Sequence, residues 1–294
     1  MKKFFNYKNI SKSLKNLLIF FPLCLSNKAF EINNFYTLFF GFIVFFFITN
    51  LIYIINDFSD KKIDKKNILK ENSSIGSELS KKTFIFVNFV LIIVTLTSYF
   101  LGYFNKFLII YIINFYLYSY VFKKIKFLDI LSLHFFYMAR LAYGAELVGV
   151  NLSLWFIAFF SSLFLILAIG KRIIQIKENR LIAKNDIIPY SIKNIKTLKT
   201  IMVFLALFNF ATIFMFFFKN HLDFLNILSS MSTKSSYSYL ETLTILFFYY
   251  LNSIRILYKL LKSKIKKDIF QYVARDYFII FSTILFLISI KLIN

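Results

Sequence analysis

The sequence predicts an all-α integral membrane protein built as a bundle of nine transmembrane helices. Of its 294 residues, 59% are hydrophobic and 17% are charged, whereas soluble domains are about half apolar and about a quarter charged. The apolar residues gather in stretches that approach the ~20 residues needed to cross ~30 Å of hydrocarbon. Gly and Pro supply only 6 and 2 residues, so these stretches are expected to be helical. The high hydrophobicity and the single cysteine, Cys24, exclude a disordered chain and a disulfide scaffold.

The predicted spans differ in strength along the chain. Pro22 interrupts the first one, and the fourth is short, although its ends are aromatic. The remaining stretches approach or reach the length of a membrane-crossing helix. The nine predicted spans cover residues 16–32, 35–56, 83–104, 107–122, 127–149, 152–170, 200–218, 238–258 and 277–294.

The distribution of basic residues predicts the orientation in the membrane. The formal charge is +22, from 36 Lys and Arg against 14 Asp and Glu. With a cytoplasmic N-terminus, 29 of the 36 basic residues fall on the cytoplasmic side and five on the other, while Arg140 and Arg255 lie within spans. This bias follows the positive-inside rule. We therefore expect a multi-pass protein of the cytoplasmic (inner) membrane, with its C-terminus outside and no nucleic-acid partner.

The spans and their loops form one predicted membrane domain over residues 1–294. Two long loops, at about 57–82 and 171–199, lie on the basic, cytoplasmic side. We expect them to form the cap of a site at the cytoplasmic surface of the lipid bilayer. Homo-oligomerisation is left open by the sequence.

Acidic residues mark where this site is expected. The run NDFSDKKID contains Asn56, Asp57, Asp60 and Asp64, directly after an apolar span. Acids at positions i, i+3 and i+7 share one face of a helix and repel one another. A divalent cation removes this repulsion, and hard oxygen ligands favour Mg²⁺. The alternative is a solvated helix end whose acids are neutralised by the four lysines between residues 61 and 66.

The run TNLIYIINDFSDKKID resembles the first aspartate-rich motif, N-D-x-x-D-x-x-x-D, of the UbiA membrane prenyltransferase superfamily. Nine helices with this motif at the cytoplasmic end of the second are the arrangement of that superfamily. The resemblance implies that Asn56, Asp57, Asp60 and Asp64 hold Mg²⁺ and a diphosphate.

The second motif of typical UbiA prenyltransferases, D-x-x-x-D, is absent from the corresponding stretch GKRIIQIKENR. Lys171 and Arg172 stand there instead, followed by Gln175. Together with KNLLIFFPL, LYSYVFKK and FLDILSLHFFYMARLAYGA, this stretch is similar to the polyprenyl-phosphate (decaprenyl-phosphate) phosphoribosyltransferase branch. The resemblance covers nearly the whole chain.

The resemblance implies transfer of 5-phosphoribose from phosphoribosyl diphosphate to a polyprenyl phosphate, giving a lipid-linked phosphoribose for cell-envelope glycan synthesis. Asp57, Asp60 and Asp64 are the implied catalytic residues. An Arg in an apolar span must face the bundle interior and meet an anion, here substrate phosphate or Asp129. The further implied substrate-binding residues are Asn56, Lys15, Tyr118, Lys124, Arg140, Lys171, Arg172 and Tyr190.

The chain also departs from the family pattern. The His-Pro and Arg-Pro elements that usually follow the first motif are absent, and Gln175 stands where the second motif has an acid. Two alternatives therefore stay open. One is a UbiA-type prenyltransferase that moves an isoprenoid from its diphosphate to an aromatic or other small acceptor. The other is a non-catalytic or transport-related membrane protein.

Overall fold

The computed structural model describes residues 14–26, 28, 31–59, 81–181, 189–228, 250, 252–260 and 276–277. Regular structure in these parts is entirely helical, with no strand. The predicted all-α class is therefore confirmed for the part of the chain that is described. The labelled elements are η1 (Leu14–Phe20), α2 (Phe21–Cys24), α3 (Ile32–Ser59), α5 (Lys81–Phe100), α6 (Lys106–Tyr120), η3 (Phe122–Lys124), α7 (Leu128–Leu147), α8 (Leu154–Leu181) and α9 (Asn194–Leu228).

Within the described residues, four helices are long and apolar enough to cross a membrane. They are Ile32–Ser59, Lys81–Phe100, Leu154–Lys177 and Asn194–Met215. They coincide with the second, third, sixth and seventh predicted spans. The fifth predicted span corresponds to the 20-residue α7, and the fourth to the 15-residue α6. The last two predicted spans lie largely outside the described residues, so a total of nine spans stays a prediction.

The first predicted span, residues 16–32, is wrong as one membrane-length helix. The chain forms the 3₁₀ helix η1, continues into the four-residue α2, and leaves the helix after Cys24. The apolar stretch Lys15–Cys24 is too short to count among the membrane-crossing helices, since its residues rise only about 1.5–2 Å each. Pro22 lies in the first turn of α2, where its missing N–H costs no hydrogen bond.

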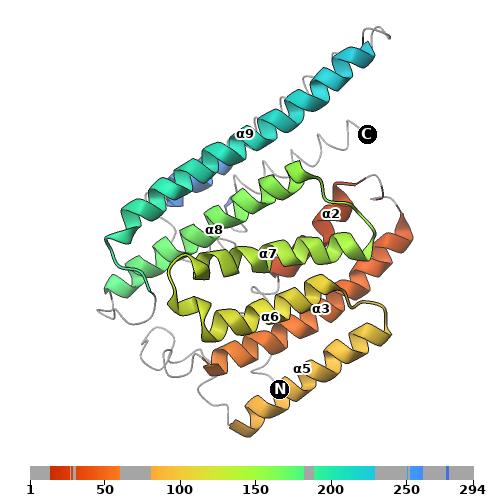
Figure 1. The fold of residues 1–294 in the computed structure, drawn as a ribbon, viewed down its shortest axis with the longest axis vertical. Helices are drawn as coiled ribbons and strands as arrows, with labels where there is room; N and C mark the ends of the chain where they lie inside the picture. The colour runs from red at the N-terminus through yellow and green to blue at the C-terminus, as the bar shows by residue number, and fades with distance from the viewer. Residues whose placement is uncertain are drawn as a thin grey trace. The chain divides into compact units, whose positions relative to one another are not determined.

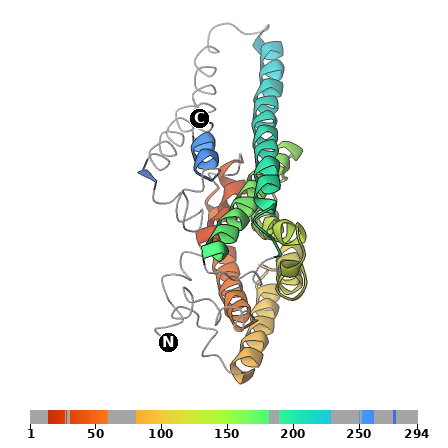
Figure 2. The same ribbon diagram turned by 90° about the vertical axis from the view of Figure 1, so that its left-hand side faces the viewer.

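The described helices belong to two compact units. The first comprises Met1–Ser153 and Ile182–Tyr190, and the second comprises Leu154–Leu181 and Ser191–Asn294. In the first unit α7 lies against η1, α2, α3 and α6, and α3 lies against α5 (Figure 1). In the second unit α8 packs along α9, which Figure 2 shows as one unbroken helix.

Helix α7 is the enclosed centre of the first unit. Thirteen of its twenty residues are buried, among them four polar ones, Asp129, Ser132, His134 and Arg140. The ring of its Tyr143 lies 4.9 Å from that of Phe45 in α3. The exposed side of α7 stays apolar, with Leu131 and Phe135 42% and 51% exposed, so these four polar residues are confined to the side that faces the neighbouring helices.

Different elements lie at the two ends of the first unit. At the C-terminal end of α7, the Lys28 ammonium donates to the carbonyls of Val148 and Gly149 at 3.2 and 3.1 Å. A cation there also complements the negative end of the helix dipole. Figure 1 shows the C-terminal ends of α3 and α6 and the N-terminal end of α7 at the other end of this unit.

Gly144 lets η1 approach α7 closely. A Cβ atom built at Gly144 overlaps the backbone carbonyl of Ile19 in η1. Gly41 in α3 is also crowded, but there the nearest atom is the terminal methyl of Leu147, a flexible side chain. Backbone atoms cannot move aside without shifting the whole of η1, whereas a methyl group can rotate away.

We predict that Gly144→Ala destabilises the protein by about 1–3 kcal/mol, the usual cost of overpacking. Thermal unfolding in detergent measures this loss. Gly41→Ala is the matched control, with a smaller effect because Leu147 adopts another rotamer. Equal melting temperatures for Gly144→Ala and the unchanged protein would contradict the close approach of η1.

Candidate active site

Asn56 and Asp57 lie in the last turn of α3, and both are partly exposed. Both therefore stand at one end of a membrane-length helix, and their role in a metal site stays a prediction. Asp60 and Asp64 lie outside the described residues. Within the described residues there is no group of three or more His, Cys, Asp or Glu placed to hold a metal. The Mg²⁺ site that needs all four positions therefore stays a prediction.

Arg140 is a buried cation in the first unit, with 2% of its surface exposed. Its Nε donates to Asn16 Oδ1 at 2.9 Å, and its Nη2 donates to the Tyr111 hydroxyl at 2.8 Å. Its Nη1 donates to the backbone carbonyl of Phe136. The Asn16 amide in turn donates to Thr49 Oγ1 at 2.9 Å. We call Asn16, Thr49, Tyr111 and Arg140 the Arg140 network.

Aromatic rings complete the surroundings of the guanidinium. Its Cζ lies 4.9 Å from the centre of the Tyr111 ring and 5.9 Å from the centres of the Phe45 and Tyr137 rings. The negative faces of such rings attract a cation, and the attraction grows when water is excluded. Among the described residues no carboxylate pairs with Arg140, so neutral groups stabilise its charge.

Asp129, the protein partner we predicted for Arg140, binds a different residue. It is fully buried in the first turn of α7, and its Oδ1 accepts a hydrogen bond of 2.6 Å from the Tyr190 hydroxyl. The same hydroxyl accepts from the backbone N–H of Phe127 at 2.7 Å. Phe127 has a φ of 66°, a conformation that costs energy in a non-glycine residue. Tyr190 therefore ties the chain preceding α9 to the start of α7.

Three further candidate residues lie in the first unit and differ in how far they are exposed. Lys15 is partly buried in η1, next to Asn16, and Lys124 is exposed at the end of η3. Tyr118 is partly buried in the last turn of α6, with its ring edge-on to that of Phe136 at 5.8 Å. Phe136 also packs against Tyr111 at 5.1 Å. Tyr118 lies near the end of the unit where α3 finishes, and ring contacts through Phe136 link it to the Arg140 network.

Lys171 and Arg172 lie in α8 and belong to the second unit. Arg172 is 2% exposed, and its Nη1 donates to Oε1 of Gln175. A glutamine at this place keeps the hydrogen-bond acceptor of an acid but not its charge. Whether these two cations converge on the same substrate as the first unit's residues stays a prediction.

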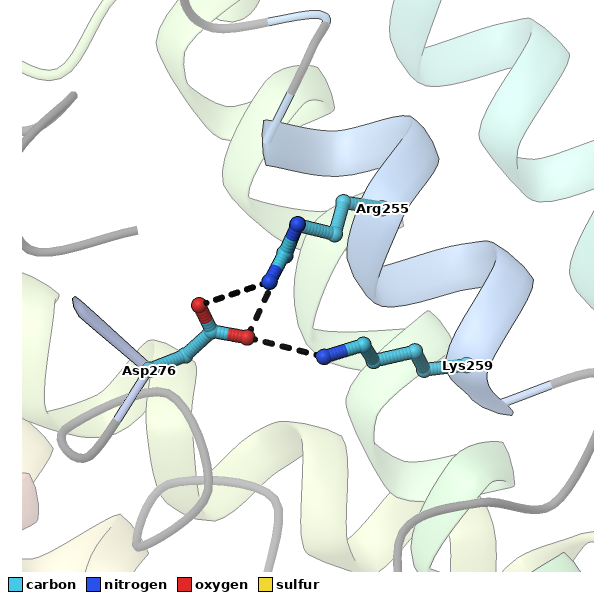
Figure 3. Close-up of polar contacts among 3 residues, drawn as sticks. All are labelled: Arg255, Lys259 and Asp276. Carbon is cyan, nitrogen blue, oxygen red and sulfur yellow. Dashed lines mark hydrogen bonds and ion pairs between the residues drawn. The ribbon is translucent and has the colours of Figure 1, made fainter. Parts of the chain in front are cut away.

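A second charge network, made of one buried carboxylate and two partly exposed cations, lies within the second unit. Asp276 accepts from Arg255 Nε and Nη2 at 3.2 and 3.1 Å and from Lys259 Nζ at 3.0 Å (Figure 3). Its side chain is 6% exposed. Arg255 was recognisable in the sequence as a cation within a predicted span, and such a cation needs a partner. The structure supplies Asp276, which stabilises the helical residues 252–260.

Sequence reasoning missed three members of the Arg140 network, namely Asn16, Thr49 and Tyr111. A signal was present, because Asn16 and Thr49 are polar residues within predicted apolar spans. Polar side chains at such positions commonly hydrogen-bond across helices. The sequence did not indicate which of them meets Arg140.

Comparison with known proteins gives little further guidance. No family model matches the chain. An uncharacterized protein of Sinorhizobium fredii, y4nM, is 27% identical over 164 residues, which is 55% of this chain and 32% of that protein. The chain therefore matches about a third of the length of this relative, whose name specifies no activity.

We predict that Tyr190→Phe lowers the stability of the ligand-free protein by about 1–3 kcal/mol, because a buried carboxylate loses a hydrogen-bond donor. Thermal unfolding without substrate measures this. Tyr99→Phe is the control, since Tyr99 is 64% exposed. If Tyr190 serves substrate alone, Tyr190→Phe will melt like the unchanged protein, and the structural role assigned here is wrong.

Proposed function

We propose that the chain is a UbiA-type membrane transferase that moves 5-phosphoribose from phosphoribosyl diphosphate to a polyprenyl phosphate. The observation that carries the proposal is the position of Asn56 and Asp57 in the last turn of α3, a helix able to cross a membrane. These two residues begin the run NDFSDKKID. Acids at the membrane edge, followed by many lysines, suit a substrate that is lipid at one end and phosphate at the other.

The proposal includes the topology predicted from the charges. Nine segments cross the inner membrane, the first of them as the short helices η1 and α2 and the chain that follows rather than as one long helix. The N-terminus is cytoplasmic and the C-terminus is outside. The working face is then the cytoplasmic one, where phosphoribosyl diphosphate, a water-soluble donor, is accessible. The polyprenyl chain of the acceptor stays in the bilayer beside the apolar helices.

Asn56 and Asp57 fit Mg²⁺ in their chemistry and in their position. An amide and a carboxylate offer hard oxygen donors, and partial exposure at a helix end leaves room for water and phosphate oxygens. With Asp60 and Asp64, which follow in the motif, they would hold the ion. Mg²⁺ bound there supplies positive charge that stabilises the departing diphosphate.

The transfer itself needs few proton movements. A phosphate oxygen of the acceptor forms a bond to the anomeric carbon of the ribose, and the bond from that carbon to the diphosphate oxygen breaks. The diphosphate leaves with the bonding electrons. Because the attacking phosphate is already anionic, no side chain has to act as a general base.

The cations of the chain bind and orient the charged groups. Lys15 and Lys124 bind phosphate in the first unit, and Lys171 and Arg172 do so in the second. The planar guanidinium of arginine can hold phosphate with two parallel hydrogen bonds, whereas lysine acts as a point charge. Within the first unit, Arg140 contributes by holding η1, α6 and α7 together, and Tyr190 contributes by fixing the start of α7.

A prenyltransferase acting on an aromatic acceptor is the competing function, because Asn56 and Asp57 suit any diphosphate. Lys171 and Arg172 favour phosphoribosyl transfer, since typical prenyltransferases carry two acids at the second motif. A non-catalytic membrane protein would show neither activity.

We predict that the purified protein converts labelled phosphoribosyl diphosphate and a polyprenyl phosphate into a lipid-soluble labelled product, and only with Mg²⁺ present. Asp57→Asn should lower the rate about 10²–10³-fold, in line with the loss of one electrostatic stabiliser. Glu146→Gln is the matched control, because Glu146 pairs with Lys106 at the opposite end of the first unit. It should retain full activity.

Two results would contradict the proposal in different ways. Prenyl transfer to a phenolic acid, without phosphoribosyl transfer, would establish the competing function. Full activity of Asp57→Asn would show that the proposed metal site is wrong, whereas the proposed class of reaction would stand.

A further inference from the structure

Asn16 is the point at which three elements of the first unit meet. It lies in η1, is fully buried, and uses both ends of its side-chain amide. The Oδ1 atom accepts from Arg140 of α7, and the Nδ2 atom donates to Thr49 of α3, each at 2.9 Å. The short helix η1 is therefore attached to two long helices through one side chain.

Two candidate site residues lie near the hydrogen bonds of Asn16. One is in η1 and the other is in α3. Lys15 directly precedes Asn16, so the amide fixes the backbone from which the Lys15 side chain extends. Thr49 and Asn56 are seven residues apart, which places them on the same face of α3 and about 10 Å apart along the helix. Because Asn16 bonds to Thr49, the neighbouring Lys15 begins about as far along the bundle as Thr49 does. The stem of its side chain is four carbons long.

We propose that Asn16 is a positioning residue, which holds Lys15 in the place where its ammonium binds substrate phosphate. The inference rests on the proposed function, because that function assigns phosphate binding to Lys15. Two substitutions separate positioning from general packing. Asn16→Asp keeps the acceptor for Arg140 but removes the donor to Thr49. Thr49→Val removes the partner of that same donor from the opposite side.

The kinetic test is a pair of comparisons on phosphoribosyl transfer. Asn16→Asp and Thr49→Val should each lower kcat/KM about 10–100-fold, the scale of a misplacement near 1 Å. In a Lys15→Met background the same substitutions should cause no further loss, because no ammonium remains to be positioned. Equal losses in both backgrounds would overturn the proposal, since Asn16 would then act independently of Lys15.

A structural test decides the inference even if the proposed reaction is not found. Leu17 and Phe47 are 48% and 54% exposed, so both can carry spin labels after conversion to cysteine in a Cys24→Ser background. The distance between the labels should be narrowly distributed in the otherwise unchanged chain. It should broaden in Asn16→Asp and in Thr49→Val. An unchanged distribution in both variants would refute the positioning role.

The two tests distinguish a failure of the proposed function from a failure of the positioning role of Asn16. Absence of phosphoribosyl transfer together with a broadened distance distribution would reject the proposed function but retain the attachment of η1 by Asn16. If prenyl transfer is then observed, the Lys15→Met comparison is repeated on that reaction, where non-additive losses would again be expected.

Discussion

The buried guanidinium of Arg140 constrains how the helices of the first unit pack. A charge removed from water costs several kcal/mol unless hydrogen bonds and nearby charges compensate it. Here the compensation comes from Asn16 in η1, Tyr111 in α6 and a backbone carbonyl of α7 itself. Because these acceptors come from different elements, none of the elements can slide without leaving the cation unsatisfied. The absence of a side chain at Gly144 allows η1 to come close enough to take part.

Smaller polar pairs set the register of the other helix contacts. Ser132 of α7 and Asn114 of α6 exchange hydrogen bonds of 2.8 and 3.0 Å, and Asn209 of α9 donates to Ser162 of α8 at 2.8 Å. In lipid, apolar side chains gain little by meeting one another rather than hydrocarbon, so packing and interhelical hydrogen bonds decide the arrangement. The candidate residues at the helix ends depend on this arrangement for their positions.

The sequence predicted the features that depend on composition and local length. The all-helical class and the four membrane-length helices of the described residues follow from hydropathy and from the scarcity of Gly and Pro. Arg140 was correctly expected to face the bundle interior. Its partners were not predictable, because Asn16 is 124 residues away in the chain and no periodicity connects them. The same limit applies to Tyr190, which is 61 residues from Asp129. The prediction of one long helix for the first span was wrong for a local reason, because the helix ends at Cys24.

A double-mutant cycle on unfolding free energy tests the central role of the Arg140 network. Arg140→Met and Asn16→Leu each leave a buried polar partner unsatisfied, so each should destabilise the protein. The double variant replaces both polar groups by apolar ones, and should be more stable than the sum of the single losses predicts. A coupling energy of about 1.5–3 kcal/mol is expected for a hydrogen bond to a charged group. Strictly additive losses would contradict the account.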